Sequence, residues 1–408
     1  MLPTLLTRPA TAALAVAAVL AVTTGCNGGA AGSEPTWVPQ PNYQGNIDPK
    51  PRLPGPQLPA PSDSGSSPAP GATPGPGASQ PSPGAPATDP TVVATRLNQP
   101  TGLVVLPDGT ALVGERTTGR ILRVQPEPGR PAVLVQRLAV DGSGDGGLLD
   151  LAISPTFDQD GLVYAYLSTA TDNRVVHFSL GSQPSAILTG IPRGRTGNAG
   201  RLAFDATGAL LTGTGDAGRP ALAASPSSLA GKILRTSDIG RPLPDNPQPG
   251  SVVFARGLRS VDGLCVDSRT GLRIAISAGT AGVPDEVNVL RPGADYGWPA
   301  DGPASVPPAR TLPAASTGGG GCALAANQLF VATSTGRSLA VGAVTRNAVG
   351  TFNSSLQNKY GRLATVVAGT DGALWLTTRN RDGRGTPIAD DDRVIRISPS
   401  DSTASPVT

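Results

Sequence analysis

The chain has 408 residues, a formal net charge of +3, three cysteines and one histidine. A charge so close to neutrality shows neither the basic footprint of a nucleic-acid-binding protein nor an acidic tail, so no nucleic-acid partner is expected. With one histidine and no cysteine pair at ligand spacing, a metal site built from soft ligands is also disfavoured.

The first 26 residues are typical of an export signal. Arg8 supplies a short positive region, residues 10–22 are apolar, and the stretch ends in the letters TTGC, with the cysteine at Cys26. This ending is typical of a bacterial lipoprotein cleavage site, so we expect Cys26 to be lipidated and to anchor the protein to the outer face of the membrane. An ordinary secretory signal or an uncleaved helix is the alternative, although the apolar run is short for a membrane span.

Residues 27–92 are rich in Pro, Gly, Ser and Ala and contain almost no large apolar side chain. Such a composition cannot bury a core, so the segment is predicted to be a disordered, extended tether. It would lift a folded domain away from the membrane. At the other end, residues 401–408 are predicted to be a flexible tail.

Residues 93–400 repeat one unit six times, which is an apolar strand, a tight turn and a second apolar strand. The spacing is near that of propeller blades, and long helical patterns between the strands are absent. The prediction is therefore an all-β, six-bladed β-propeller, with a β-sandwich as the alternative. Glycine or asparagine accommodates the positive φ of a tight hairpin, and the six turns are predicted at Gly109, Gly161, Gly208, Gly271, Asn327 and Gly372.

Two Pro- and Gly-rich stretches, residues 241–250 and 297–321, interrupt the repeat. Long loops on a rigid scaffold commonly carry binding specificity, so we expect them to cover one face of the ring. The central channel of the propeller is the expected site for a small ligand.

Cys265 and Cys322 are the two cysteines left after Cys26. Outside the cytoplasm such a pair usually forms a disulfide, which we expect here, with two buried free thiols as the alternative. On the chain-entropy model, closing this loop would stabilise the fold by about 4 kcal/mol.

The middle of the chain carries the letters GRLAF at 200–204, GDAG at 215–218 and SLAGKILR at 228–235. This pattern resembles the glucose/sorbosone dehydrogenase family, whose members are six-bladed propellers that hold pyrroloquinoline quinone (PQQ) and calcium. The resemblance covers nearly all of residues 100–398.

The resemblance implies that Gly197 stands where the family has its proton-abstracting histidine, and that Asp216 is the carboxylate that would orient this histidine. A general base is typically worth about 10²–10⁴-fold in rate, so its loss would leave a poor catalyst. Residues 260–262 also differ from the family's Asn-Pro-Gln. His177 lies in a predicted strand and is interpreted as structural or surface-lying, not as a substitute base. A histidine restored at position 197 could gain activity if the pocket is otherwise intact.

The resemblance also implies binding positions. Those for a ligand are Asp145, Asp216, Arg259 and Gly279, the last belonging to the dipeptide whose carbonyls hold calcium in the family. A candidate calcium site, in a loop similar to a calcium-binding one, consists of Asp285, Glu286 and Tyr296. The acidic run at 390–392 is interpreted as a solvated turn in preference to a cation site.

Several arginines flank these motifs. If they line the mouth of the channel they would attract an anion, because arginine makes bidentate contacts to carboxylate and phosphate. Solvated loop arginines are the equally weighted alternative. The set consists of Arg193, Arg195, Arg201, Arg219, Arg256 and Arg259.

These patterns together predict a cell-envelope lipoprotein, and the order of lipid site, tether and propeller resembles an actinobacterial envelope lipoprotein. The expected function is non-catalytic binding of a small molecule, either a sugar or an anion, or of an envelope protein, with membrane contact through Cys26. Calcium is a candidate cofactor, and PQQ is not expected but stays open. The alternative is a divergent PQQ- and calcium-dependent sugar oxidoreductase.

Overall fold

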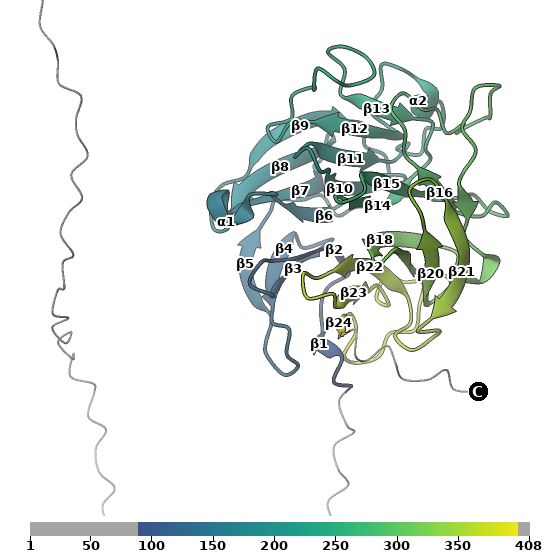
Figure 1. Cartoon of the computed structure of the whole chain (residues 1–408). Coiled ribbons are helices and arrows are strands. Elements are labelled where there is room, and N and C mark those ends of the chain that lie inside the picture. The colour runs from purple at the N-terminus through teal and green to yellow at the C-terminus, as the bar shows by residue number, and fades with distance from the viewer. Residues whose placement is uncertain (1–88, 399–408) are drawn as a thin grey trace, which may run out of the picture. The chain divides into compact units, whose positions relative to one another are not determined.

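The computed structural model describes residues 89–398. The predicted signal with Cys26, the tether up to residue 88 and the predicted tail lie outside the described residues. The described residues form six four-stranded antiparallel sheets, arranged as the blades of a β-propeller (Figure 1). The prediction of a six-bladed propeller is confirmed. No helix in this part of the chain is long and apolar enough to cross a membrane.

The first five blades follow one another along the chain, each starting with its innermost strand. Blades 1 and 2 consist of β2 (Pro100–Val105), β3 (Ala111–Glu115), β4 (Arg120–Val124) and β5 (Val133–Arg137), then β6 (Leu148–Ile153), β7 (Leu162–Ser168), β8 (Asn173–Ser179) and β9 (Ser185–Ile191). Blades 3 and 4 consist of β10 (Gly200–Phe204), β11 (Leu210–Thr214), β12 (Lys232–Thr236) and β13 (Val253–Arg256), then β14 (Val261–Asp267), β15 (Leu272–Ser277), β16 (Glu286–Val289) and β17 (Arg310–Thr311). Blade 5 consists of β18 (Gly319–Ala325), β19 (Gln328–Thr333), β20 (Ser338–Val344) and β21 (Val349–Ser355). Short helices are α1 (Phe157–Asp160), α2 (Ala221–Ala224) and the 3-10 turn η1 (Ala314–Ser316).

The sixth blade joins the two ends of the described chain. Its inner strands are β22 (Leu363–Ala368), β23 (Leu374–Thr378) and β24 (Val394–Ile397), and its outer strand is β1 (Val92–Ala94). β1 pairs antiparallel with β24. The ring is therefore closed by backbone hydrogen bonds between its first and last strands.

Each predicted turn connects the first and second strands of a blade. The six turn residues all have positive φ, between +58° at Asn327 and +81° at Gly109. Most residues with a Cβ cost about 1–2 kcal/mol in this region. Glycine has no Cβ, and asparagine tolerates the region through local hydrogen bonds of its side chain, which is why these residues stand at the six positions.

The core consists of six apolar clusters, each lying between two neighbouring blades. In one of them, Leu112 and Ile121 of blade 1 pack against Leu148 and Val163 of blade 2. Burying one such side chain contributes about 1.5–3 kcal/mol, so the packing between blades stabilises the ring as a whole. The innermost strands surround the middle of the ring (Figure 1).

A disulfide links two of the blades. Cys265 of β14 and Cys322 of β18 form it, with their Cα atoms 5.8 Å apart. Both residues are buried in the cluster between blades 4 and 5. The expected pairing is therefore present, and it crosslinks the innermost strands of neighbouring blades.

The acidic run before β24 is not the solvated turn that was predicted. Asp391 and Asp392 are buried, and Asp391 forms an ion pair with Arg393 at 2.8 Å. Asp392 accepts hydrogen bonds from the backbone of Asn380 and from the Thr378 hydroxyl. These carboxylates hold the loop that leads into the closing strand.

Candidate ligand-binding cavity

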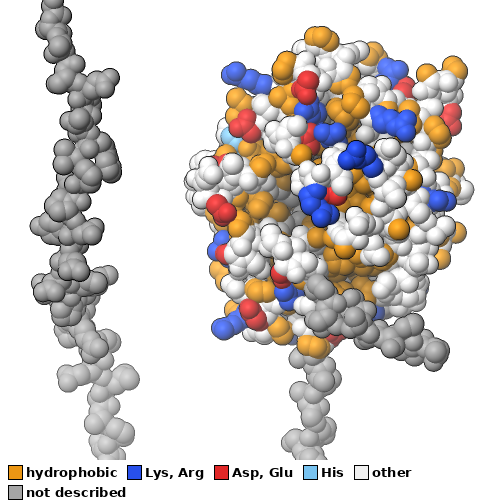
Figure 2. Space-filling model, viewed as in Figure 1, with side chains coloured by type: hydrophobic (Ala, Val, Ile, Leu, Met, Phe, Trp, Pro, Cys, Tyr) orange, Lys and Arg blue, Asp and Glu red, His pale blue; other side chains and the backbone are white. Residues whose placement is uncertain are grey.

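A cavity of about 750 Å³ lies at one edge of the blades. Most of its lining residues lie at or before the start of the innermost strands, or after the second strands, of five blades. These positions share one edge of an antiparallel hairpin. Residues 99 and 144–145 represent the first kind, and residues 116 and 379 the second. Trp298 comes from the loop between β16 and β17. Figure 2 shows one face of the ring, on which Lys and Arg side chains gather near the middle.

The structure brings together the four positions predicted to bind a ligand. Asp145, Asp216 and Arg259 line the cavity. Gly279 lies between two lining residues, Ala278 and Thr280. Their role in binding stays a prediction, while their common location follows from the fold.

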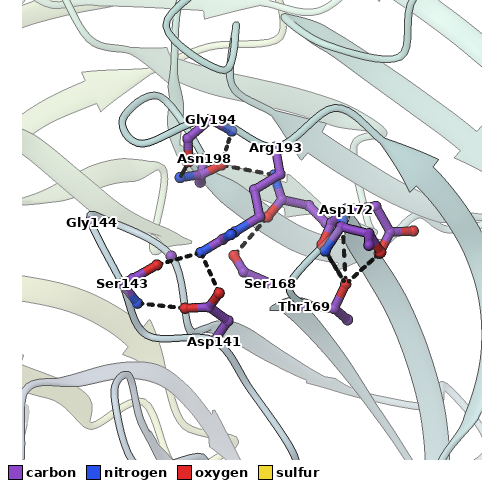
Figure 3. Close-up of polar contacts among 12 residues, drawn as sticks. Asp141, Ser143, Gly144, Ser168, Thr169, Asp172, Arg193, Gly194 and Asn198 are labelled. Atoms are coloured by element: carbon purple, nitrogen blue, oxygen red, sulfur yellow. Dashed lines mark hydrogen bonds and ion pairs between the residues drawn. The ribbon is translucent and has the colours of Figure 1, made fainter.

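Asp145 anchors the loop that carries Gly197. Its Oδ2 accepts a hydrogen bond from the backbone N–H of Gly197 at 2.7 Å. Its Oδ1 accepts from the backbone and the side-chain amide of Asn198. The Asn198 amide also bonds the backbone of Gly194 in both directions, at 2.8 and 2.9 Å (Figure 3). The carboxylate of Asp145 is therefore already engaged by protein donors.

The same loop is tied to blade 2 at its other end. Arg193 forms an ion pair with Asp141 at 3.0 Å and donates to the Ser143 hydroxyl at 2.8 Å (Figure 3). Asp141 also accepts a hydrogen bond from the backbone of Ser143. Arg193 is thus neutralised outside the cavity, as is Arg256, which forms an ion pair with Asp295 at 2.9 Å.

Gly197 has no room for a side chain. Its φ is +72°, in the left-handed region. A Cβ built there would lie 2.6 Å from Oδ1 of Asp216 and 2.6 Å from the backbone N of Gly218. In this loop conformation a histidine introduced at position 197 by one substitution would not fit.

Asp216, whose expected partner would be the family's histidine, is hydrogen-bonded to other groups of the protein. Its Oδ1 accepts from the Gly218 backbone at 2.8 Å, and its Oδ2 accepts from the indole N–H of Trp298 at 3.0 Å. The guanidinium of Arg259 lies over the Trp298 ring, 5.7 Å from its centroid. The retained carboxylate therefore holds Trp298 at the cavity wall.

The predicted calcium ligands do not meet. Asp285 accepts from the backbone N–H groups of Gly279 and Gly319, both at 2.8 Å. The Tyr296 hydroxyl donates to the Val289 carbonyl, and Glu286 accepts from the Asn288 side chain. No group of three or more His, Cys, Asp or Glu side chains within residues 89–398 could hold a metal ion.

Arg259 is hydrogen-bonded to the Gly279 carbonyl oxygen, the atom at which the resemblance implies calcium. One of its terminal nitrogens donates to the carbonyl oxygen of Gly279. A cationic side chain here satisfies an oxygen that a metal would otherwise bind. His177 does not line the cavity; it lies on β8, and its ring is 5.6 Å from that of Tyr164.

Three cavity arginines, Arg116, Arg379 and Arg384, were missed by the sequence analysis. Arg116 and Arg379 come directly after β3 and β23 and line the cavity together with the predicted Arg201 and Arg259. A signal was available, because Asp216 also lies close after a second strand, two residues beyond the end of β11. In blades 1, 4 and 6 the residue directly after the second strand lines the cavity.

These features define a six-bladed propeller with a polar, arginine-rich cavity at one edge of its blades. The chain belongs to the Glucose / Sorbosone dehydrogenase family, whose model matches residues 97–304. It is 27% identical over 226 residues to the aldose sugar dehydrogenase YliI of Escherichia coli K12 and 28% identical over 253 residues to quinoprotein glucose dehydrogenase B of Acinetobacter calcoaceticus. These matches cover 51% and 52% of this chain, and the chain spans 61% and 52% of the two relatives.

Solved structures of relatives have the same fold. The PQQ-bound aldose sugar dehydrogenase of Streptomyces coelicolor is 37% identical, with a TM-score of 0.71 over 75% of this chain and 96% of that one. A putative oxidoreductase (glucose dehydrogenase) of Thermus thermophilus is 35% identical, with a TM-score of 0.69 over 75% of this chain and 98% of that one.

Proposed function

We propose that this protein is a cell-envelope lipoprotein whose propeller binds a small ligand in the cavity and does not oxidise it. The observation that carries this proposal is the conformation of Gly197, which leaves no space for a general base where the family has one. None of the described lining residues is a histidine. Oxidation of a sugar hydroxyl requires a base within hydrogen-bond reach of its proton.

The residues of the cavity also do not fit the calcium that would accompany PQQ. The Gly279 carbonyl is bonded to Arg259, and both oxygens of Asp285 are bonded to backbone amides. A hard cation needs six to eight oxygen ligands, and these oxygens are engaged. We therefore derive no redox step for this cavity.

The cavity is suited to binding. Its volume of about 750 Å³ falls within the range of small-molecule sites. The wall is rigid, because Asp145 and Asp216 hold the surrounding loops through hydrogen bonds. A preorganised wall lowers the entropic cost of binding, which favours a recognition role.

The setting that we propose is the outer face of the cell membrane, with a lipid on Cys26 and the ring carried on residues 27–92. It rests on the sequence pattern of the first 26 residues. Labelling cells with a palmitate analogue tests it. Loss of the label in a Cys26→Ser variant is expected, and retention of the label would refute it.

The experiment for the binding role titrates PQQ with calcium into the full-length protein by calorimetry. Dye reduction with a panel of aldoses is then measured in the same preparation. The Streptomyces coelicolor enzyme serves as the positive control. We expect no sugar-dependent dye reduction, together with thermal stabilisation by at least one sugar or sugar acid.

The alternative function is a divergent sugar oxidoreductase, and the persistence of a large cavity in this family's fold favours it. Saturable PQQ binding with sugar-dependent dye reduction in the control assay would establish that alternative. The same result would overturn the non-catalytic role.

A further inference from the structure

The charged side chains that line the cavity differ in how many hydrogen bonds and ion pairs they form with the rest of the protein. Most of them have partners in the protein. Asp145 and Asp216 are bonded as described, and Asp382 forms an ion pair with Arg362 at 2.9 Å. The charged lining residues are Arg116, Arg201, Arg259, Arg379, Arg384, Asp145, Asp216, Asp262 and Asp382.

Arg116 and Arg259 both have partners in the protein, Arg116 more of them than Arg259. Arg116 donates to the Gln99 side chain at 2.6 and 3.0 Å and to the Gly146 carbonyl at 2.7 Å. Arg259 donates to Gly279 and lies over Trp298. Arg116 is therefore largely used in fixing the wall, while Arg259 is held by one carbonyl and by the Trp298 ring.

Arg379 differs from them. Its Nε is buried, and within residues 89–398 its guanidinium has no hydrogen bond or ion pair. Burial, and then the like charge of Arg201, lowers the pKa of Arg379 to about 10. A desolvated cation without a counter-ion is costly, so an arginine held in this way in a cavity wall points to an anion.

The nearby carboxylates of Asp262 and Asp382 raise the pKa of Arg379, but burial and the charge of Arg201 outweigh them. Burial raises the pKa of the neighbouring Asp262 to about 6, against the effect of Arg201 and Arg379. Arg201 donates to the Asp262 carbonyl oxygen at 2.6 Å and to the Thr365 hydroxyl at 3.2 Å. Its one carboxylate contact, with Asp150, is long at 3.5 Å. The guanidinium groups of the buried Arg201 and the half-buried Arg379 thus line the cavity with weak counter-ions.

We infer that the ligand of the cavity carries a carboxylate or phosphate group, which binds between Arg379 and Arg201. This inference rests on the proposed function and names the class of its ligand: a sugar acid or a sugar phosphate. Guanidinium groups match the paired oxygens of both anions. A volume of about 750 Å³ leaves room for the sugar beyond the anionic group.

Four probes separate the sources of this chemistry: D-glucose, D-glucuronate, D-glucose 6-phosphate and inorganic phosphate. Each is titrated by calorimetry into the full-length protein in a buffer free of phosphate and carboxylate. We expect the charged sugar with the matching anion to bind at least about tenfold more tightly than glucose. Glucose binding as tightly as both charged sugars would refute the inference and leave the proposed function standing. Absence of binding by all three anions would also refute the inference.

Variants locate the anion. Arg379→Gln is expected to weaken binding of the charged sugar about ten- to a hundredfold, and Arg379→Lys to weaken it less. Asp262→Asn removes a repelling charge and is expected to tighten binding. The matched control is Arg346→Gln, at an exposed loop position, which should leave affinity unchanged.

Stability separates a binding role from a structural one. Without ligand, Arg379→Gln should melt at the same temperature as the wild type or higher, because it removes a half-buried cation that forms no hydrogen bond or ion pair within residues 89–398. A lower melting temperature would mean that the guanidinium stabilises the fold itself. That result, or unchanged affinity in Arg379→Gln, would overturn the inference.

Discussion

Replacing Gly197 with histidine tests how the loop has changed. At φ +72° a residue with a Cβ costs about 1–2 kcal/mol. The contacts of 2.6 Å to Asp216 and Gly218 add an overpacking cost of about 1–3 kcal/mol. We therefore expect Gly197→His to lower the free energy of unfolding by about 2–5 kcal/mol and to show no sugar dehydrogenase activity with PQQ and calcium. Urea denaturation and dye reduction measure the two effects.

Alanine variants separate the two costs. Gly208 has a similar φ of +78°, but a Cβ there meets no atom within 4 Å. Gly208→Ala should therefore report the backbone cost alone, and Gly197→Ala should lose about 1–3 kcal/mol more. A Gly197→His variant as stable as the wild type, with sugar-dependent dye reduction, would refute the reasoning.

Other predictions concern the stability of the ring. Cys322→Ser should lower the free energy of unfolding by about 4 kcal/mol; wild type unfolding at the same urea concentration with and without reductant would contradict this. Burial raises the pKa values of Asp150, Asp262 and Asp392 to about 6 each, so their contribution to stability is full below about pH 4 and is lost as the pH rises through about 6. The melting temperature should therefore be higher at pH 5 than at pH 7.5, and the opposite trend would exclude this linkage. Lys232→Met removes a buried ammonium that donates to three backbone carbonyls, and should cost about 3 kcal/mol by urea denaturation; an unchanged midpoint would show that these bonds contribute little.

The fold follows from local signals that the sequence carries. The hairpin at Gly208 needs a positive φ, which glycine readily adopts. The strands on either side of it, β10 and β11, are recognisable as apolar runs in the sequence alone. Six such hairpins at blade spacing leave few ways to bury their faces, so a ring could be predicted. β1 was harder to place, because three residues carry little pattern and its pairing with β24 depends on ring closure.

The sequence could predict which motif residues lie at the cavity, but not the contacts that their side chains make there. Asp145 and Arg259 were placed correctly because motif positions fix them on the backbone. Asp285 and Glu286 have separate partners because they are neighbours in the chain, and neighbouring residues at a strand point to opposite faces. Arg379 was missed because its proximity to Arg201 arises across the ring, from segments 178 positions apart by subtraction.

The most direct test of the central claim is a single-turnover experiment. The full-length protein is mixed anaerobically with PQQ and calcium, an aldose is added, and the absorbance of PQQ is followed. The account predicts that the spectrum stays that of the oxidised quinone, because no base can occupy the position of Gly197. Stoichiometric reduction of PQQ that depends on the sugar would contradict the account.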